Sequence, residues 1–350
     1  MIARRTLLAT LLAASTTALT PLAATQAKAE DMLELSVALG VDDANFNVTT
    51  SSVFRLAEDL GFYKKYNLHV TFVPLDGTPQ AVAALQAGAV DAADISLDAA
   101  IRLRAANGVP LRGVVAVGTG SPFLIAAKDD IKTLQDLVGR SYAIADNGSL
   151  DHTLTQAVLR SQGVDPDGPN FVAIGAPTVR VQALAAGQVD ATTVSFGTYA
   201  SIDGTAGIHV LLPSSEFSTH VPAVSKFVAA NEATIASKQA ALQAFTNALI
   251  ETSREMEAHP EKWIAAATAA RPDLPPARIE LTAKFIADRW CINGCLDPRE
   301  LDDSVAFVYA NPDFKDVPAV AAGDMIDLSF TQRALETLGT AGGTGLDSRQ

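Results

Sequence analysis

The sequence has few of the residues that metal and redox chemistry use. It contains only two cysteines, and its five histidines are scattered along 350 residues. No two histidines flank a glutamate at helical spacing, as zinc proteases require. There is no nucleophile elbow, no P-loop, and no G-x-G-x-x-G following a predicted strand. These absences argue against an enzyme, and we expect no catalytic residue, no metal site and no cofactor.

Positive charge is also scarce. Lysine and arginine number 26 against 39 acidic residues, which gives a formal charge of −13 at pH 7. Nucleic acids and anionic membrane surfaces bind clustered basic side chains, so neither is expected as a partner. Beyond residue 29 no apolar run approaches the roughly 18 residues of a membrane span. We therefore expect a soluble protein that associates weakly with itself and is a monomer.

Residues 1–29 have the features of a cleaved signal peptide. Arg4 and Arg5 form a basic start, an apolar stretch covers residues 7–22, and Ala27-Lys28-Ala29 is an A-x-A cleavage site. The apolar stretch is interrupted by polar residues and falls short of the about 20 needed to span a bilayer. The arginine pair loosely resembles a twin-arginine signal. The general secretory route is favoured, and the mature chain is expected outside the cytoplasm.

The two cysteines are close together in the sequence Trp290-Cys291-Ile292-Asn293-Gly294-Cys295. An oxidising compartment permits a disulfide between Cys291 and Cys295, and the Asn-Gly pair offers a tight turn between them. Two reduced thiols are an alternative. A metal pair is a further alternative, which the lack of a nearby histidine disfavours.

A nine-residue motif occurs twice. Residues 84–92 are A-L-Q-A-G-A-V-D-A, and residues 183–191 are A-L-A-A-G-Q-V-D-A. Each copy ends an alanine-rich helical stretch, places glycine where a left-handed C-cap is needed, and continues as a short apolar strand. The strands lead to Ser96 and Ser195. Two such units far apart predict two similar α/β lobes, with a small-molecule cleft where the lobes face each other.

Strands and helices alternate along both halves of the chain. Strands are predicted at residues 33–39, 68–73, 92–96, 112–117, 123–127, 141–145, 171–174, 190–194 and 209–212. Helices are predicted at residues 51–66, 99–107, 149–162, 178–186, 231–258, 261–270, 276–289, 298–308 and 329–338. This alternation is typical of mostly parallel sheets covered by helices.

Four segments resemble one known family in the right order. They are Leu56–Val70, Gln80–Asp91, Asp130–Arg140 and residues 178–194. They are similar to motifs of the periplasmic substrate-binding proteins of ABC importers, in the branch that binds sulfonates, taurine, nitrate and thiamine-pyrimidine precursors. The resemblance covers residues 33–338. It implies the periplasmic binding protein type 2 fold, a periplasmic location, capture of a ligand as two lobes close, and ABC permease and ATPase subunits as partners.

The resemblance also suggests how the chain is divided. Residues 1–29 would be the signal peptide, and residues 30–120 with 228–338 would form lobe I together with the C-terminal helices. Residues 121–227 would form lobe II. A two-strand hinge would lie near residues 120–127 and 221–229. The glycine-, threonine- and serine-rich tail, residues 339–350, is expected to be disordered.

Candidate ligand-binding residues follow from the rule that open α/β sheets bind ligands beyond the carboxyl ends of their strands. The candidates are Asp42, Asp43, Asn45, Asn47, Thr78, Ser96, Asp98, Thr119, Asn147, Ser149, His152, Ser195, Phe196 and His220. Each has a plainer alternative. Thr78 and Ser149 can cap their own helices, Phe196 can belong to a core, and the histidines can be ordinary surface groups.

The predicted loops carry several aspartates and no lysine or arginine. A sulfonate or nitrate site would more comfortably include an arginine fork. The sequence therefore favours a neutral or cationic nitrogenous ligand over an anion. A ligand-sensing module of a membrane receptor, or an enzyme related to thiamine-pyrimidine synthesis, is a less favoured alternative to a transport protein.

Overall fold

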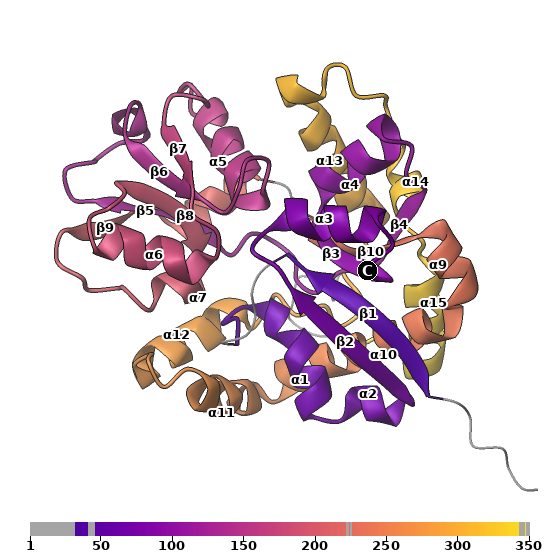
Figure 1. The fold of residues 1–350 in the computed structure, drawn as a ribbon. Coiled ribbons are helices and arrows are strands. Elements are labelled where there is room, and N and C mark those ends of the chain that lie inside the picture. The colour runs from indigo at the N-terminus through magenta and orange to yellow at the C-terminus, as the bar shows by residue number, and fades with distance from the viewer. Residues whose placement is uncertain (1–31, 41–45, 222–223, 225, 343–346, 348–350) are drawn as a thin grey trace, which may run out of the picture. The chain divides into compact units, whose positions relative to one another are not determined.

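The computed structural model describes residues 32–40, 46–221, 224, 226–342 and 347. Its named strands form two five-stranded sheets, and the order of strands is β2-β1-β3-β10-β4 in the first sheet and β7-β6-β8-β5-β9 in the second (Figure 1). The first sheet comprises β1 (Leu33–Leu39), β2 (Leu68–Pro74), β3 (Ala92–Ser96), β4 (Leu111–Val115) and β10 (Lys226–Asn231). The second comprises β5 (Phe123–Lys128), β6 (Ser141–Ile144), β7 (Asn170–Ala173), β8 (Ala191–Ser195) and β9 (Ile208–Leu212).

The two sheets have the same topology. In the first, β1 pairs in parallel with β2 and β3, whereas β10 runs antiparallel to both β3 and β4. In the second, β6 pairs in parallel with β7 and β8, whereas β5 runs antiparallel to both β8 and β9. Four strands of each sheet thus share one direction, which confirms the prediction of two mostly parallel α/β sheets. The reversed strand of each sheet is the one at which the chain enters from the other sheet: β5 follows β4 of the first sheet, and β10 follows β9 of the second.

Helices cover both sheets (Figure 1). They are α1 (Val53–Asp59), α2 (Phe62–Lys65), α3 (Thr78–Gln86), α4 (Leu97–Ile101), α5 (Leu150–Ser161), α6 (Pro177–Ala185), α7 (Phe196–Tyr199), α8 (Ser214–Phe217), α9 (Glu232–Ser237), α10 (Gln239–Ala258), α11 (Pro260–Ala270), α12 (Pro276–Ile286), α13 (Pro298–Tyr309), α14 (Ala322–Met325) and α15 (Ser329–Leu338). Within the described part of the chain, no helix is long and apolar enough to cross a membrane.

Two predicted helices are each split in the structure. The predicted helix at residues 51–66 ends at Asp59 and restarts at Phe62, because Gly61 adopts a left-handed φ of 77°. The predicted helix at residues 231–258 is interrupted at Lys238. The Lys238 ammonium hydrogen-bonds to the Glu34 carbonyl of β1 and to the Asp91 carboxylate just before β3. This long-range contact accompanies a break that local helical spacing does not indicate.

The repeated motif forms the same turn twice. Gly88 and Gly187 have φ values of 67° and 72°, in the left-handed region that glycine adopts without a steric penalty. The N–H of the next residue then reaches back to a carbonyl of the preceding helix, from Ala89 to Ala84 and from Gln188 to Ala183. The predicted glycine C-caps are confirmed.

The aspartate of each motif binds a serine of the neighbouring strand, and we call each arrangement a Ser–Asp bridge. Asp91 Oδ2 accepts hydrogen bonds from Ser36 N and Oγ at 2.7 and 2.8 Å, and Asp91 N donates to Ser36 Oγ at 3.0 Å. Asp190 and Ser141 make the same three bonds at 3.0, 2.8 and 3.1 Å. A lysine ammonium also donates to each aspartate carboxylate at 2.8 Å. Lys238, between α9 and α10, donates to Asp91, and Lys128 of β5 donates to Asp190.

The structure pairs Cys291 with Cys295 in a disulfide, and both residues are buried. The loop between them is held by the chain's C-terminal segment. The Asp347 carboxylate accepts from the N–H groups of Asn293 and Cys295, and Asn293 Nδ2 donates to the Ala341 carbonyl. Asp347 thus satisfies backbone N–H groups that the disulfide loop presents. The predicted signal peptide lies outside the described residues.

Replacing Asp190 with asparagine tests the second Ser–Asp bridge. Burial alone would raise the pKa of Asp190, but the hydrogen bonds from Lys128 and Ser141 outweigh it and lower the pKa to about 2. We expect Asp190→Asn to reduce the free energy of unfolding at pH 7 by about 2 kcal/mol, because it removes charge-assisted hydrogen bonds from a largely buried group. Urea unfolding measures this, and Asp59→Asn, in an exposed pair with Arg55, is the matched control.

The same bridge predicts a pH dependence. The pKa of Asp190 is lower in the folded than in the unfolded chain, so its contribution is complete above the unfolded value and lost as the pH falls towards 2. The difference in stability between the parent and Asp190→Asn should therefore shrink between about pH 4 and pH 2. A difference that stays constant over this interval would contradict the assigned bridge.

Candidate functional site

A cavity of about 1050 Å³, part of it open to solvent, lies where strand ends of the two sheets meet. Residues from the half that contains the first sheet contribute Gly40, Asn47, Thr49, Thr50, Ser51, Asp76, Gly77, Thr78, Val117, Gly118, Thr119, Gly120, Lys226, Ile286 and Arg289. Residues from the half that contains the second sheet contribute Pro122, Phe123, Ala145, Ser149, Leu150, Asp151, Pro177, Arg180, Ser195 and Thr198. Both halves thus supply polar groups to one space.

The hydroxyl-rich segment Thr49–Ser52, just before α1, is held by hydrogen bonds. The indole N–H of the buried Trp263 donates to Ser52 Oγ at 2.9 Å, and Ser52 Oγ donates to the Thr49 carbonyl at 2.6 Å. These bonds hold the chain in place beside Thr50 and Ser51. Within the described part of the chain, the hydroxyls of Thr50, Thr78 and Thr119 make no hydrogen bond, so they are available to a bound molecule.

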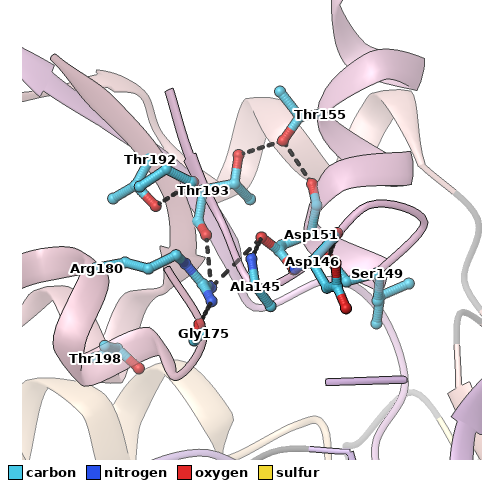
Figure 2. A network of polar contacts seen from close by, with 12 residues as sticks. Ala145, Asp146, Ser149, Asp151, Thr155, Gly175, Arg180, Thr192, Thr193 and Thr198 are labelled. Atoms are coloured by element: carbon cyan, nitrogen blue, oxygen red, sulfur yellow. Dashed lines mark hydrogen bonds and ion pairs between the residues drawn. The ribbon is translucent and has the colours of Figure 1, made fainter. Parts of the chain in front are cut away.

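A buried ion pair forms the wall on the side of the second sheet (Figure 2). Arg180 of α6 is only 2% exposed, and its guanidinium lies 3.6 Å from the Asp151 carboxylate of α5. Arg180 also donates to the carbonyls of Gly175 and Thr193 at 2.5 and 3.3 Å. Asp151 in turn accepts from Ala145 N at 3.0 Å and from Ser149 Oγ at 2.7 Å. The positive charge of Arg180 is therefore largely compensated.

A chain of hydroxyls supports this ion pair from inside the second sheet (Figure 2). Thr155 Oγ1 donates to the Asp151 carbonyl at 2.6 Å and lies 2.7 Å from Thr193 Oγ1, which lies 2.6 Å from the Tyr142 hydroxyl. Burial raises the pKa of Tyr142 above its ordinary value, so this hydroxyl stays protonated. The network fixes α5 to β8 and so holds the wall of the cavity rigid.

Two further cations reach the cavity from elsewhere in the chain. The Lys226 ammonium, at the start of β10, pairs with the buried Asp94 carboxylate at 2.6 Å. Arg289 follows α12 and is anchored by a hydrogen bond from Nε to the Phe285 carbonyl and by its guanidinium, 4.6 Å from the Phe285 ring centre. Its nearest carboxylate, Asp288, is half-exposed and 3.8 Å away. In the part of the chain that the structure describes, Arg289 is the least compensated cation of the lining.

The structure brings five of the predicted site residues together at this cavity: Asn47, Thr78, Thr119, Ser149 and Ser195. The candidates Asp42, Asp43 and Asn45 lie outside the described residues. The other candidates, Ser96, Asp98, Asn147, His152, Phe196 and His220, do not belong to the cavity's described lining.

These other candidates have identifiable environments. His152 Nδ1 accepts from Gly148 N at 3.0 Å, and burial lowers the pKa of His152 despite the nearby carboxylates of Asp151, Asp167 and Asp313. His220 contacts Gln162 at the surface. Phe196 stacks on Phe285 with ring centres 5.1 Å apart. Ser96 is buried, Asn147 is exposed, and Asp98 lines a second cavity.

Sequence analysis missed the three basic residues of the lining, Arg180, Lys226 and Arg289. The argument for a neutral or cationic ligand assumed that the site contains no lysine or arginine, and this assumption is wrong. Arg180 lies on a helix and reaches back to the cavity, and Arg289 comes from a helix-rich region remote in the sequence. Of the three, only Lys226 could have been predicted as a site residue, because it lies in the predicted hinge segment at residues 221–229.

Helix α7, which follows β8, packs closely against residues preceding α1. A Cβ atom on Gly197 would lie 2.2 Å from the Val48 carbonyl oxygen, so only glycine fits. Beside this contact, Phe196 stacks on Phe285, and Asp203 forms an ion pair with Arg278 of α12. These contacts join the two halves of the cavity wall.

Comparison with known proteins gives a consistent result. A family model described as "NMT1/THI5 like" matches residues 49–263, more than half of the chain. No protein with a curated description matches the sequence significantly.

Several solved structures share the fold. A protein of Bordetella bronchiseptica RB50 is 18% identical with a TM-score of 0.72, covering 88% of this chain and 98% of that one. The alkanesulfonate-binding protein of Xanthomonas axonopodis pv. citri, bound to MOPS, is 19% identical with a TM-score of 0.67, covering 84% and 98%. The periplasmic nitrate-binding protein of Synechocystis PCC 6803 is 13% identical with a TM-score of 0.68, covering 89% and 90%.

Substitution of Gly197 tests the close contact with Val48. We expect Gly197→Ala to lower the free energy of unfolding by about 1–3 kcal/mol, because the added methyl group overlaps a backbone oxygen. Thermal unfolding measures the change. Gly323→Ala is the matched control, since a Cβ there meets no atom within 4 Å, and it should leave the melting temperature nearly unchanged. Equal melting temperatures for the two variants would mean that the contact does not constrain the protein.

Proposed function

Because the chain belongs to the NMT1/THI5-like family, we propose that it is the solute-binding component of an ABC importer. In this function it captures a small polar molecule in the cavity between the two sheets and passes it to a permease that an ATPase drives. The fold, shared with periplasmic binding proteins, supports this assignment. The proposal includes a periplasmic location after removal of the signal peptide, residues 1–29.

One observation carries the proposal: a single cavity receives polar groups from both halves of the chain, and the chain passes between these halves beside it. Thr119 and Pro122 line the cavity on the first passage, and Lys226 lines it on the second. A solute bound there contacts both halves at once, so binding favours their association. We place the hinge of the proposed lobes at these passages, near residues 120–127 and 221–229.

The chemistry of the lining favours binding over catalysis. Its described residues include no histidine and no cysteine, and its two carboxylates are Asp76 and Asp151. Asp151 is held by Ala145 N, Ser149 and Arg180, so it is not placed to transfer a proton. Ser149 Oγ donates to this carboxylate, and the described lining offers no histidine to act as the base of a serine or threonine nucleophile. The site is therefore suited to hold and release an unchanged solute.

The available groups indicate that the solute carries an oxyanion. Arg180 and Lys226 each have a carboxylate partner, whereas the two terminal amino groups of Arg289 make no hydrogen bond within the described residues. Their planar arrangement matches two oxygens of a carboxylate, sulfonate or similar group. The hydroxyls of Thr50, Thr78 and Thr119 can donate to the remaining oxygens.

A ligand screen tests this assignment. Methanesulfonate, nitrate, a pyrimidine and a polyamine are added to the purified protein, and the melting temperature is measured. A molecule that binds the folded state at 100 times its Kd should add about 2.7 kcal/mol to the stability. We expect the oxyanions to raise the melting temperature and the polyamine to leave it unchanged. If only the cationic probe raises it, the proposed ligand class is wrong.

Replacing Arg289 with glutamine should weaken oxyanion binding by about 10- to 100-fold, which corresponds to the loss of a charged hydrogen bond. Isothermal titration calorimetry measures the Kd. Arg333→Gln is the matched control, because Arg333 also lies over a phenylalanine ring, Phe330, but outside the cavity lining. If both variants bind like the parent, Arg289 does not contact the solute.

The proposed export predicts the start of the mature chain. Expressed in a Gram-negative cell, the protein should be recovered from the periplasmic fraction with Glu30 as its first residue, because Ala27-Lys28-Ala29 is the cleavage site. N-terminal sequencing or intact mass measurement decides this. A chain retained in the cytoplasm with residues 1–29 attached would rule out the proposed location.

A further inference from the structure

The stretch of chain that brings Arg289 to the cavity belongs to no helix or strand. It lies between α12 and α13, and we call its residues from Arg289 to Cys295 the Arg289 segment. A stretch without regular structure has no ladder of hydrogen bonds, so its buried backbone groups must find other partners. The position of Arg289 therefore depends on contacts with distant parts of the chain.

Two backbone hydrogen bonds join the Arg289 segment to the chain that follows β4. The Thr119 N–H donates to the Arg289 carbonyl at 3.4 Å. The Ala116 N–H donates to the Gly294 carbonyl at 3.1 Å. Thr119 and Arg289 both line the cavity, so a shift of the segment would displace two of the groups that the proposed function assigns to the solute.

The disulfide closes the far end of the segment. Cys291 and Cys295 are buried, and Cys295 has a left-handed φ of 53°. Residues other than glycine seldom adopt this conformation, and they keep it only where the surrounding contacts enforce it. The disulfide loop is thus held in one shape by its neighbours.

Arg254 of α10 joins the segment to the end of α15. Its guanidinium donates to the Ile292 carbonyl at 2.7 Å and to Asn293 Oδ1 at 3.2 Å. It also donates to the Leu338 and Gly339 carbonyls, at 3.1 and 2.6 Å. The planar guanidinium presents several donors at once, so it holds these two stretches of chain against each other.

Asp347 supports the same loop from a remote part of the sequence. Its carboxylate accepts from Asn293 N at 2.5 Å and from Cys295 N at 3.2 Å. Asn293 is only 1% exposed, and its Nδ2 donates to the Asp347 and Ala341 carbonyls, both at 3.0 Å. Loss of this carboxylate would leave buried N–H groups without acceptors, which favours movement of the loop.

We propose that the disulfide, Arg254 and Asp347 form a clamp that positions Arg289 for the solute. The proposal rests on the proposed function and adds positioning residues to its site. None of these groups belongs to the described lining of the cavity, so each acts through the Arg289 segment. With the clamp in place, Arg289 and Thr119 are ordered before the solute binds, and binding does not have to order them.

Removal of the clamp in two independent ways tests the proposal. The double variant Cys291→Ser, Cys295→Ser lacks the disulfide, and Asp347→Ala lacks the acceptor of two N–H groups. If Arg289 is then in place in about a tenth of the molecules, the Kd for methanesulfonate in calorimetric titration should rise about 10-fold. Asp347→Asn retains one carbonyl acceptor and should recover part of the affinity.

A double-mutant cycle shows whether the clamp acts through Arg289. In the Arg289→Gln background, the clamp substitutions should change the Kd by less than about twofold, because the group that they position is absent. Asp190→Asn is the matched control. It lowers the stability at the Ser–Asp bridge of the second sheet, away from the clamp, and should bind methanesulfonate like the parent.

Two results of these titrations would overturn the inference while the proposed function stands. In the first, the clamp variants have lower melting temperatures but bind methanesulfonate like the parent, which means that the clamp only stabilises the fold. In the second, they weaken binding equally with and without Arg289, which means that they act on the cavity by another route.

Amide hydrogen exchange without a solute gives a readout that needs no ligand. The clamp variants should exchange faster at Ala116 and Thr119, whose N–H groups donate to the Arg289 segment, but not at Gln188 in the second copy of the repeated motif. Unchanged exchange at Ala116 and Thr119 would overturn the inference. If the parent binds no oxyanion, the proposed ligand fails, and these exchange rates still decide whether the clamp holds the segment.

Discussion

The contact on which the rest of the structure depends is the pair of Ser–Asp bridges. Each bridge joins an aspartate just before one strand to a serine of the strand beside it, Asp91 before β3 to Ser36 of β1 and Asp190 before β8 to Ser141 of β6. Three hydrogen bonds between one pair of residues fix the register of neighbouring parallel strands. A slip by one residue would turn every side chain to the opposite face of the sheet. The bridges lie just before β3 and β8, so they set the register of these strands, and the polar cavity lies at the opposite ends.

The cavity lining combines charged groups that are paired with each other and a cation whose terminal amino groups make no hydrogen bond within the described residues. Arg180 and Asp151 neutralise each other and are supported by Thr155 and Thr193, so they shape the wall without leaving a free charge. Arg289 belongs to the half of the lining that contains the first sheet, and its terminal amino groups make no hydrogen bond within the described residues. Under the proposed function, few groups would bind the solute, and the wall formed by the neutralised pair would not need to reorganise on binding.

Sequence patterns predicted what depends on local chemistry. Strand β1 and helix α15 have the predicted bounds, and Gly88 and Gly187 end their helices as the repeat indicates. Asn47 and Thr78, which were candidates because they follow predicted strands, line the cavity. The break at Lys238 and the placement of Arg289 could not be found in this way. Each depends on contacts with residues that are remote in the sequence, and helical periodicity does not predict such contacts.

The passage of the chain between the sheets has an evolutionary consequence. The second sheet is built from one continuous stretch of sequence, and the ends of that stretch, near Pro122 and Lys226, line the same cavity. A segment whose ends adjoin can be inserted, lost or exchanged without disturbing the partner that hosts it. Recombination at these two points would replace Arg180 and Leu150 in one event. Under the proposed function, such an exchange would change half of the residues that contact the solute while the other half is inherited intact.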